Sequence, residues 1–199
     1  MKILITGFGP FDTFTSNPTE ELVRLLSEEF SYMEHGILPV VYGEAGEELL
    51  KIIEKVSPDI LVSFGLNGKI SHIALEEIAI NLMSSEIPDN RGNLPADRPI
   101  SEKGPLAYRS LLPNGKIMKR LRGAGIPAIS SYSAGAYICN EVFYTGLQWA
   151  YHNDKKAGFI HVPMATYMMA SDPRSYRTPH MPMDMIFRAG KLTIETIME

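Results

Sequence analysis

Apolar positions along the chain follow two spacings, which predict strands and helices in turn. Apolar runs of about four to eight residues favour buried strands, whereas apolar positions roughly three and four residues apart favour amphipathic helices. We therefore expect strands at residues 2–6, 37–41, 59–64, 73–82, 126–130 and 159–162. We expect helices at residues 44–56, 113–121, 136–151 and 183–197, and a further helix that begins after Asn17.

A few residues indicate where these elements begin and end. Asn17 suits the cap of a helix, Pro18 its first position and Glu20 its third, as in a variant of the capping box. Residues 73–82 mix apolar and acidic residues, so a short helix is the alternative to a strand there. Residues 86–105 are rich in proline and polar residues and predict a long loop, which in compact domains is often functional.

Strands that alternate with helices predict an α/β fold with a largely parallel sheet covered on both faces. The 199 residues fit one domain, so we expect residues 1–199 to form a single-domain three-layer α/β/α sandwich around a twisted, mixed sheet. In such folds the functional residues gather beyond the carboxyl ends of the strands.

Composition narrows the possible partners. Hydrophobic residues make up 45% and charged residues 21% of the chain, which is the usual balance of a soluble globular protein. A formal net charge of −4 favours neither nucleic acid nor an anionic membrane surface. No segment approaches the roughly 18–20 apolar residues of a membrane span, and the N-terminus is a poor signal peptide. Since a single cysteine is compatible with a reducing compartment, we expect a cytoplasmic protein.

That single cysteine, Cys139, follows the small residues 133–135, which join a predicted strand to a predicted helix. We therefore expect Cys139 in or near the first turn of the helix. The unpaired N–H groups and the helix dipole there favour a negative charge, so the thiol should ionise readily and nearby N–H groups could hold an oxyanion. The local context supports a buried structural cysteine equally well.

Two other positions could complete a catalytic group. His161 lies near the end of an apolar strand, where a buried imidazole needs a partner and could act as a general base; a satisfied core histidine is the alternative. Glu76 and Glu77 point to opposite faces if they lie in a strand, so one of them could orient the imidazole. A surface glutamate pair is the alternative. The five histidines lack metal-ligand spacing, so we expect no metal site.

The loop after the first strand could be taken for a nucleotide loop because it contains Gly7 and Gly9. The third glycine of a dinucleotide fingerprint would fall on Asp12, and no Walker lysine follows, so this function is not favoured. Phe8 and Phe11 flank the loop and could line a small apolar pocket or pack in the core.

Together, these features resemble the pyrrolidone carboxyl peptidases, also called pyroglutamyl peptidase I. The matching motifs occur in the family's order over residues 1 to about 165. They are Thr6-Gly7-Phe8 with Pro10-Phe11, Asn17-Pro18, Pro58-Asp59-Ile60, Ile78-Ala79-Ile80-Asn81, Ile87-Pro88-Asp89-Asn90, Ser133-Ala134-Gly135 with Cys139-Asn140, and Gly158-Phe159-Ile160-His161-Val162-Pro163. Each motif is unspecific alone, but the ordered set is specific.

The resemblance implies a cysteine peptidase that hydrolyses the bond after an N-terminal pyroglutamyl residue of a peptide, without metal or cofactor. It implies that Cys139 is the nucleophile, His161 the base and Glu76 the acid that orients His161. Asn17 and the backbone of Leu66 fall where the family hydrogen-bonds the lactam. The positions that correspond to the family's apolar lactam pocket are Phe8, Phe11, Ile87, Tyr137 and Ile138.

Three positions depart from the family's pattern. Glu86 and Ile70 stand where the family usually has arginine, and Met164 stands where it often has tyrosine. A Glu86 side chain that points into the site should hinder formation of the thiolate. Two alternatives therefore stay open: a diverged relative that cleaves another small acyl cap, and a non-catalytic binding protein on the same scaffold. Since the family is often oligomeric, we expect a dimer or tetramer.

Overall fold

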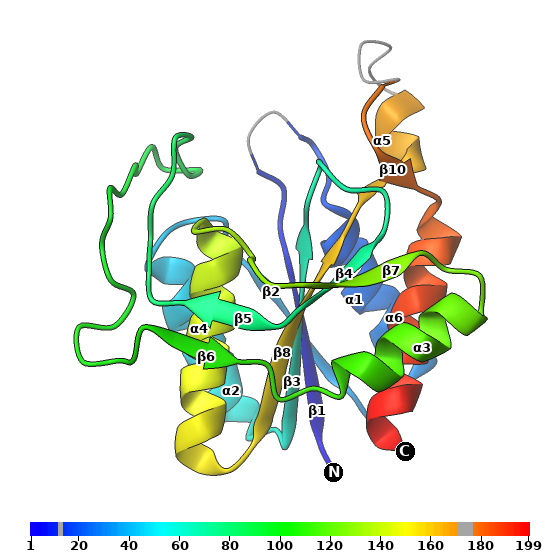
Figure 1. The fold of residues 1–199 in the computed structure, drawn as a ribbon, viewed down its shortest axis with the longest axis horizontal. Coiled ribbons are helices and arrows are strands. Elements are labelled where there is room, and N and C mark those ends of the chain that lie inside the picture. Colours follow the sequence, from blue (N-terminus) through cyan, green and yellow to red (C-terminus); the bar gives the residue numbers. More distant parts are fainter. Residues whose placement is uncertain (12–13, 171–176) are drawn as a thin grey trace.

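The computed structural model describes residues 1–11, 14–170 and 177–199. At its centre lie the strands β1 (Ile3–Phe8), β2 (Glu34–Leu38), β3 (Ile60–Leu66), β4 (Ile73–Glu76), β7 (Ala128–Ser131) and β8 (Lys156–Val162). Within the described residues they form one six-stranded sheet in the order β2-β1-β3-β8-β4-β7 (Figure 1). β2, β1, β3 and β8 run parallel, whereas β4 is antiparallel to β8 and parallel to β7. The predicted mixed, largely parallel sheet is confirmed.

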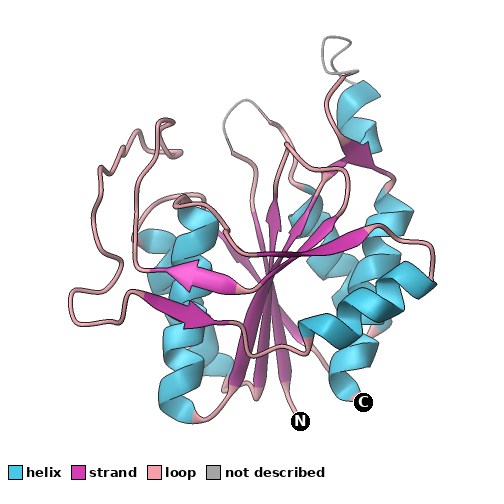
Figure 2. Cartoon of the chain, viewed as in Figure 1, coloured by secondary structure: helices cyan, strands magenta, loops and turns pink. Residues whose placement is uncertain are grey.

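Helices cover both faces of this sheet (Figure 2). The described helices are α1 (Pro18–Glu29), α2 (Glu44–Val56), α3 (Asn114–Gly123), α4 (Ile138–Asn153), the short α5 (Thr166–Ala170) and α6 (Met183–Met198). α1, α3 and α6 lie on one face, and α2 and α4 on the other. A hydrophobic core lies on each face of the sheet, and successive strand residues point into opposite cores. Ile3 and Ile5 belong to one core and Leu4 to the other. The predicted three-layer sandwich is confirmed.

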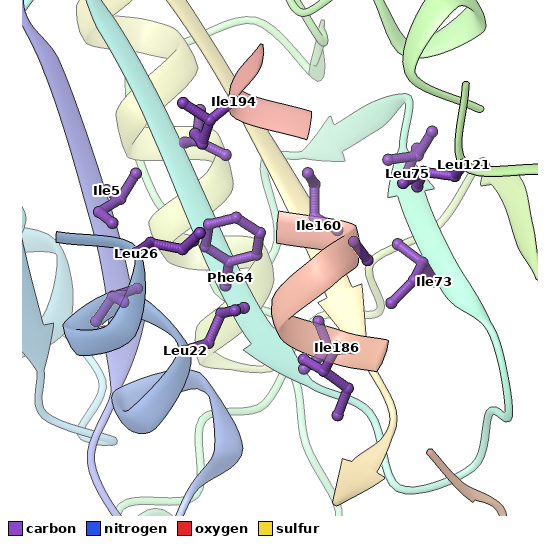
Figure 3. Close-up of a cluster of buried hydrophobic side chains, with 14 of the residues drawn as sticks. Ile5, Leu22, Leu26, Phe64, Ile73, Leu75, Leu121, Ile160, Ile186 and Ile194 are labelled. Atoms are coloured by element: carbon purple, nitrogen blue, oxygen red, sulfur yellow. The ribbon is translucent and has the colours of Figure 1, made fainter. Parts of the chain in front are cut away.

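Figure 3 shows the core beneath α1 and α6. Leu22 and Leu26 of α1 pack with Ile186 of α6 against Phe64 of β3. Gly190 allows the close approach of the two helices, because a Cβ there would lie 2.9 Å from Cδ1 of Leu26. This face of the sheet is filled by apolar side chains, and the candidate functional side chains project from the opposite face.

α1 begins where the sequence predicts. Asn17 caps it by accepting hydrogen bonds from the backbone N–H of Thr19 at 3.0 Å and from its hydroxyl at 2.8 Å. Gly7 lets β1 approach this helix, because a Cβ there would lie 2.4 Å from the carbonyl oxygen of Thr19. Gly7 therefore has a packing role, and Asp12 lies outside the described residues.

The single strand predicted at residues 73–82 is wrong. The chain leaves the main sheet at Glu77, and β5 (Ile78–Ile80) pairs antiparallel with β6 (Ala107–Arg109), a strand that was not predicted. The bend is fixed by backbone hydrogen bonds, since the N–H of Glu77 donates to Ser131 at 2.7 Å and its carbonyl accepts from Ser110 at 2.9 Å. A run of apolar residues does not reveal such a change of sheet.

Other boundaries differ by a few residues. β2 begins at Glu34 and ends at Leu38, just before Pro39, which has no N–H to donate to a ladder. α4 begins at Ile138, because Tyr137 before it is extended. The short strands β9 (Met164–Ala165) and β10 (His180–Met181) and the helix α5 were not predicted.

Residues 86–105 form the expected long loop, which leaves after β5 and returns into β6 (Figure 1). Among the described helices, none combines the length and the apolar character needed to cross a membrane.

Candidate active site

Two adjacent strands bring Glu76 and His161 together. Glu76 ends β4 and His161 is the next-to-last residue of β8. The antiparallel register pairs Ala74 with His161 and Glu76 with Phe159, so Glu76 and His161 are diagonal neighbours on one face of the sheet. Oε1 of Glu76 lies 2.8 Å from Nδ1 of His161. Both residues are buried, with 1% and 4% of their surface exposed.

The structure also separates the two adjacent glutamates. Glu77 is half-buried, and its carboxylate accepts a hydrogen bond from the hydroxyl of Ser130 at 3.0 Å. The backbone of Glu76 is fixed as well, because the side-chain amide of Asn114 donates a hydrogen bond to its carbonyl oxygen at 3.2 Å. Of the pair, Glu76 therefore lies beside the imidazole.

Cys139 lies at the second position of α4, as the sequence predicts. Gly135 turns the chain toward this helix with φ of 78°, a region that favours glycine. The cap residue Tyr137 makes no side-chain hydrogen bond to the helix start. Among the described residues, the backbone N–H groups of Ile138 and Cys139 have no hydrogen-bond partner, as is usual in a first helical turn.

Asn140 anchors this first turn to β5. Its side-chain oxygen accepts from the N–H of Ile80 at 3.0 Å, and its amide donates to the carbonyls of Ile80 at 2.8 Å and Leu82 at 3.0 Å. Because Asn140 is fully buried, these bonds hold Cys139 at a fixed distance from the strand that follows Glu76.

The thiol and the imidazole interact directly. His161 hydrogen-bonds Cys139 as well as Glu76. Burial by itself lowers the pKa of His161, but the hydrogen bonds to Cys139 and Glu76 outweigh burial and raise this pKa to about 9. A protonated imidazole in this position is a suitable counterion for a thiolate. The structure thus joins all three predicted catalytic residues in one cluster.

The sulfur of Cys139 lies directly over β3. Gly65 of β3 pairs with His161 of β8, and a Cβ on Gly65 would lie 2.9 Å from the sulfur and 2.6 Å from Cζ of Phe159. The ring of Phe159 packs edge-on against the imidazole with centroids 5.0 Å apart. Gly65 was not predicted as a functional residue, although a glycine near the end of a buried strand is a signal for close approach.

A small pocket opens beside the thiol. Its lining residues are Phe8, Phe11, Asn17, Val40, Leu66, Tyr137, Ile138 and Cys139. All predicted substrate-contacting residues except Ile87 line it. Val40 also lines it and was not predicted, because an apolar residue of a predicted strand does not by itself indicate a pocket. Ile87 is 53% exposed in the long loop, where the neighbouring Pro88 accepts a hydrogen bond from the hydroxyl of Tyr137 at 3.2 Å.

Asn17, a polar residue of the pocket lining, already makes several hydrogen bonds within the protein. The side-chain oxygen of Asn17 accepts two hydrogen bonds from Thr19, and its amide donates one to the carbonyl of Gly9 at 3.0 Å. A side-chain amide carries two N–H groups, and the second one of Asn17 has no partner among the described residues, so it is suited to bind a ligand.

The positions that depart from the family's pattern are not part of this lining. Glu86 is exposed, Ile70 is half-buried and Met164 is buried, and none of them lines the pocket. Among the described residues, no group of three or more His, Cys, Asp or Glu side chains could hold a metal ion.

Solved structures match the fold of the whole chain. A crystal structure of a mutant pyrrolidone carboxyl peptidase from Pyrococcus furiosus superimposes with a TM-score of 0.93 at 39% identity, covering 100% of this chain and 98% of that chain. Crystal structures of the same organism's pyrrolidone carboxyl peptidase and its cysteine-free mutant give a TM-score of 0.92 at 38% identity, with the same coverage.

Whole sequences match as well. The pyrrolidone-carboxylate peptidase of Pyrococcus furiosus is 40% identical over 205 residues, covering 100% of this chain and 99% of that protein. The protein of that name from Treponema denticola is 36% identical over 206 residues, covering 100% and 94%. The family model described as pyroglutamyl peptidase matches residues 1–199. The chain therefore belongs to the pyroglutamyl peptidase family.

Proposed function

We propose that this chain hydrolyses the amide bond after an N-terminal pyroglutamyl residue of a peptide, with residues 1–199 acting as one catalytic domain. Cys139 is the nucleophile, His161 moves the proton, and Glu76 orients the imidazole. The observation that carries the proposal is the connected Cys139–His161–Glu76 cluster beside a small apolar pocket. Family membership supports the choice of substrate.

The first half of the reaction forms an acyl-enzyme. The Cys139 thiolate attacks the carbonyl carbon of the pyroglutamyl residue, and a C–S bond forms as negative charge moves to the carbonyl oxygen. The free N–H groups of Ile138 and Cys139 are suited to bind this oxyanion. His161 then donates its proton to the leaving nitrogen, the C–N bond breaks, and the shortened peptide departs.

The second half regenerates the thiolate of Cys139 beside the protonated imidazole of His161. His161, now neutral, accepts a proton from water, and the resulting hydroxide attacks the thioester carbonyl. The C–S bond breaks, pyroglutamate leaves, and the proton on His161 again faces the sulfur. Glu76 stays hydrogen-bonded to Nδ1, which leaves the other ring nitrogen for these transfers.

The pocket suits a neutral five-membered lactam. Phe8, Tyr137 and Ile138 supply apolar walls, while the spare N–H of Asn17 and the backbone of Leu66 are suited to hydrogen-bond the lactam. A site built for the lactam N–H and C=O leaves its own polar groups unpaired when an open-chain residue enters, and so rejects it.

A chromogenic pyroglutamyl amide tests the proposal. We expect the wild type to hydrolyse this amide in reducing buffer and Cys139→Ala to lose activity by about 10⁴-fold or more. The matching glutamyl amide, with an open chain, controls for lactam recognition and should react far more slowly. An inactive wild type, or an active Cys139→Ala variant, would overturn the proposal.

Glu86 was the reason to consider a different acyl cap, and its exposed position outside the pocket lining removes that reason. No observation favours a second function. We also propose a cytoplasmic dimer or tetramer, on the resemblance to the family and the single cysteine. Light scattering of the purified chain checks the assembly, and cell fractionation checks the location.

A further inference from the structure

Glu141 is a buried carboxyl group that the proposed reaction does not use. It follows Cys139 by two residues in the first turn of α4 and is 3% exposed. Its Oε1 accepts a hydrogen bond from the backbone N–H of Gly43 at 2.9 Å, and the N–H of Gly46 donates to the carboxylate as well. Its Oε2 has no hydrogen-bond partner among the described residues.

These bonds make Glu141 the cap of a different helix. Gly43 is the cap residue of α2 and has no side chain with which to bind the free N–H groups of that helix start. The carboxylate from α4 takes this role, and Gly46 leaves room for it, because a Cβ there would lie 3.0 Å from Oε1. The start of the helix that carries Cys139 is thereby tied to the start of α2.

The segment just before α2 forms part of the pocket. Val40 lines the pocket, and Tyr42 packs edge-on against the lining residue Tyr137 with ring centroids 5.4 Å apart. The N–H of Tyr42 donates to Oδ2 of Asp89 at 2.9 Å, directly before the N–H of Gly43 that binds Glu141. Two carboxylates on consecutive backbone N–H groups therefore hold residues 40–43.

Asp89 belongs to the long loop, and the next residue, Asn90, also binds residues 40–43. The N–H of Asn90 donates to the carbonyl of Val40 at 3.1 Å, and its side-chain amide donates to that of Pro10 at 3.0 Å. Residues 40–43 are thus held by hydrogen bonds to two acidic side chains, Asp89 and Glu141, and by the bond from Asn90.

The charges around Glu141 make its ionisation sensitive to pH. Burial raises its pKa to about 7, although the hydrogen bonds from Gly43 and Gly46 act in the opposite direction. Asp89 on the loop and Glu47 on α2 raise it further, and the hydroxyl of Tyr42 is the other titratable group that faces it. Among the described residues, no Lys, Arg or His forms an ion pair with it.

We propose that Glu141 is a positioning residue for substrate binding, whose ionised carboxylate holds residues 40–43 against the first turn of α4 so that the two walls of the pocket stay in register. Glu141 does not touch the reacting atoms, because its side chain faces α2 while Cys139 faces the pocket. This inference rests on the proposed function, since the pocket is taken to bind the pyroglutamyl group.

The test is Glu141→Gln, which keeps the shape and one acceptor oxygen but removes the charge, assayed with a pyroglutamyl amide from about pH 5.5 to about pH 8.5. At the upper end we expect KM to rise about fivefold while kcat stays within about twofold. The wild-type KM should rise as the pH falls through about 7, when Glu141 becomes protonated, and this inflection should be missing in the variant.

Glu54→Gln removes an exposed charge from α2 and should leave the wild-type profile unchanged. Gly46→Ala crowds the same carboxylate from the α2 side and should also raise KM, so the inference does not depend on one variant. A Glu141→Gln enzyme that keeps the wild-type inflection in KM, or loses kcat with KM unchanged, would contradict the inference. An inactive wild type would refute the proposed function instead.

Discussion

Two buried glutamates in this protein have opposite surroundings. Glu76 and Glu141 are both almost fully buried, and each has Oε1 hydrogen-bonded and Oε2 without a partner among the described residues. Glu76 faces an imidazole that can carry a positive charge, whereas Glu141 faces backbone N–H groups with Asp89 nearby. A buried carboxylate is costly without a cation beside it, and the raised pKa of Glu141 follows from that lack.

Among changes to the glutamates and their neighbours, the largest effect should come from Glu76→Gln, which removes the charge of the first buried glutamate. Without the carboxylate, His161 loses both its orientation and a reason for its raised pKa, so proton transfer to and from Cys139 becomes inefficient. We expect kcat for a pyroglutamyl amide to fall about 10³-fold, with KM changed much less. Steady-state kinetics measure both constants.

Glu77→Gln is the matched control. Glu77 is adjacent to Glu76, but in the described part of the chain its own carboxylate binds only Ser130. It should keep kcat within about threefold of the wild type. If the two substitutions have equal effects, the assignment of Glu76 to the imidazole is wrong.

The next largest effect should come from Gly65→Ala, which moves the thiol relative to the Glu76–His161 pair. The new methyl group would meet the sulfur of Cys139 and the ring of Phe159, and neither can withdraw freely. We expect kcat to fall about 10- to 100-fold and unfolding to become easier by about 1–3 kcal/mol. Kinetics and urea unfolding of the same preparation measure the two changes, and an unaltered kcat would contradict the placement of the sulfur over β3.

A smaller effect should appear in the stability of Glu141→Gln. The pKa of Glu141 is raised from 4.5 to about 7 in the fold, so between these values the folded chain binds a proton that the unfolded chain has released. The contribution of Glu141 to stability is therefore fully present below about pH 4.5 and is lost as the pH rises through about 7. From about pH 5 to about pH 7.5, the wild type should lose about 2 kcal/mol more unfolding free energy than the variant.

Urea unfolding at the two pH values checks this difference. The same comparison with Glu54→Gln should show no such divergence from the wild type, because that side chain is exposed. Parallel stability curves for wild type and Glu141→Gln would mean that Glu141 titrates near its ordinary pKa.

The smallest effect should come from Glu86→Arg. Glu86 is exposed, in contrast to the two buried glutamates. Glu86 lies at the surface of the long loop and outside the pocket lining, where water and salt screen its charge. We expect kcat/KM to change by less than about threefold. A gain of tenfold or more would show that this charge acts on the thiol.

The two glutamates also show how far the sequence alone could lead. A strand pattern predicts that one of Glu76 and Glu77 points inward, but which one does so depends on the register with β8, whose partner His161 lies 85 positions away. Only the resemblance to the family selected Glu76. Burial of Glu141 follows from the packing of α2 on α4 and from a contact 98 positions away, which no local pattern contains.

Other predictions follow the same division. The helix start at Asn17 was correct because the capping signal is local, and the layered fold was correct because alternating strands and helices specify it. The single strand at residues 73–82 was wrong because its bend is set by hydrogen bonds to distant segments. Ile87, expected in the pocket, lies exposed outside its lining.

The measurement that tests the central claim most directly is alkylation of Cys139 by iodoacetamide, followed by mass spectrometry alongside activity. Because the chain has one cysteine, each added group reports on this thiol. We predict that activity on a pyroglutamyl amide falls one for one with alkylation at neutral pH, and that free pyroglutamate slows both by filling the adjoining pocket. A fully alkylated chain that still hydrolyses the amide would contradict the account.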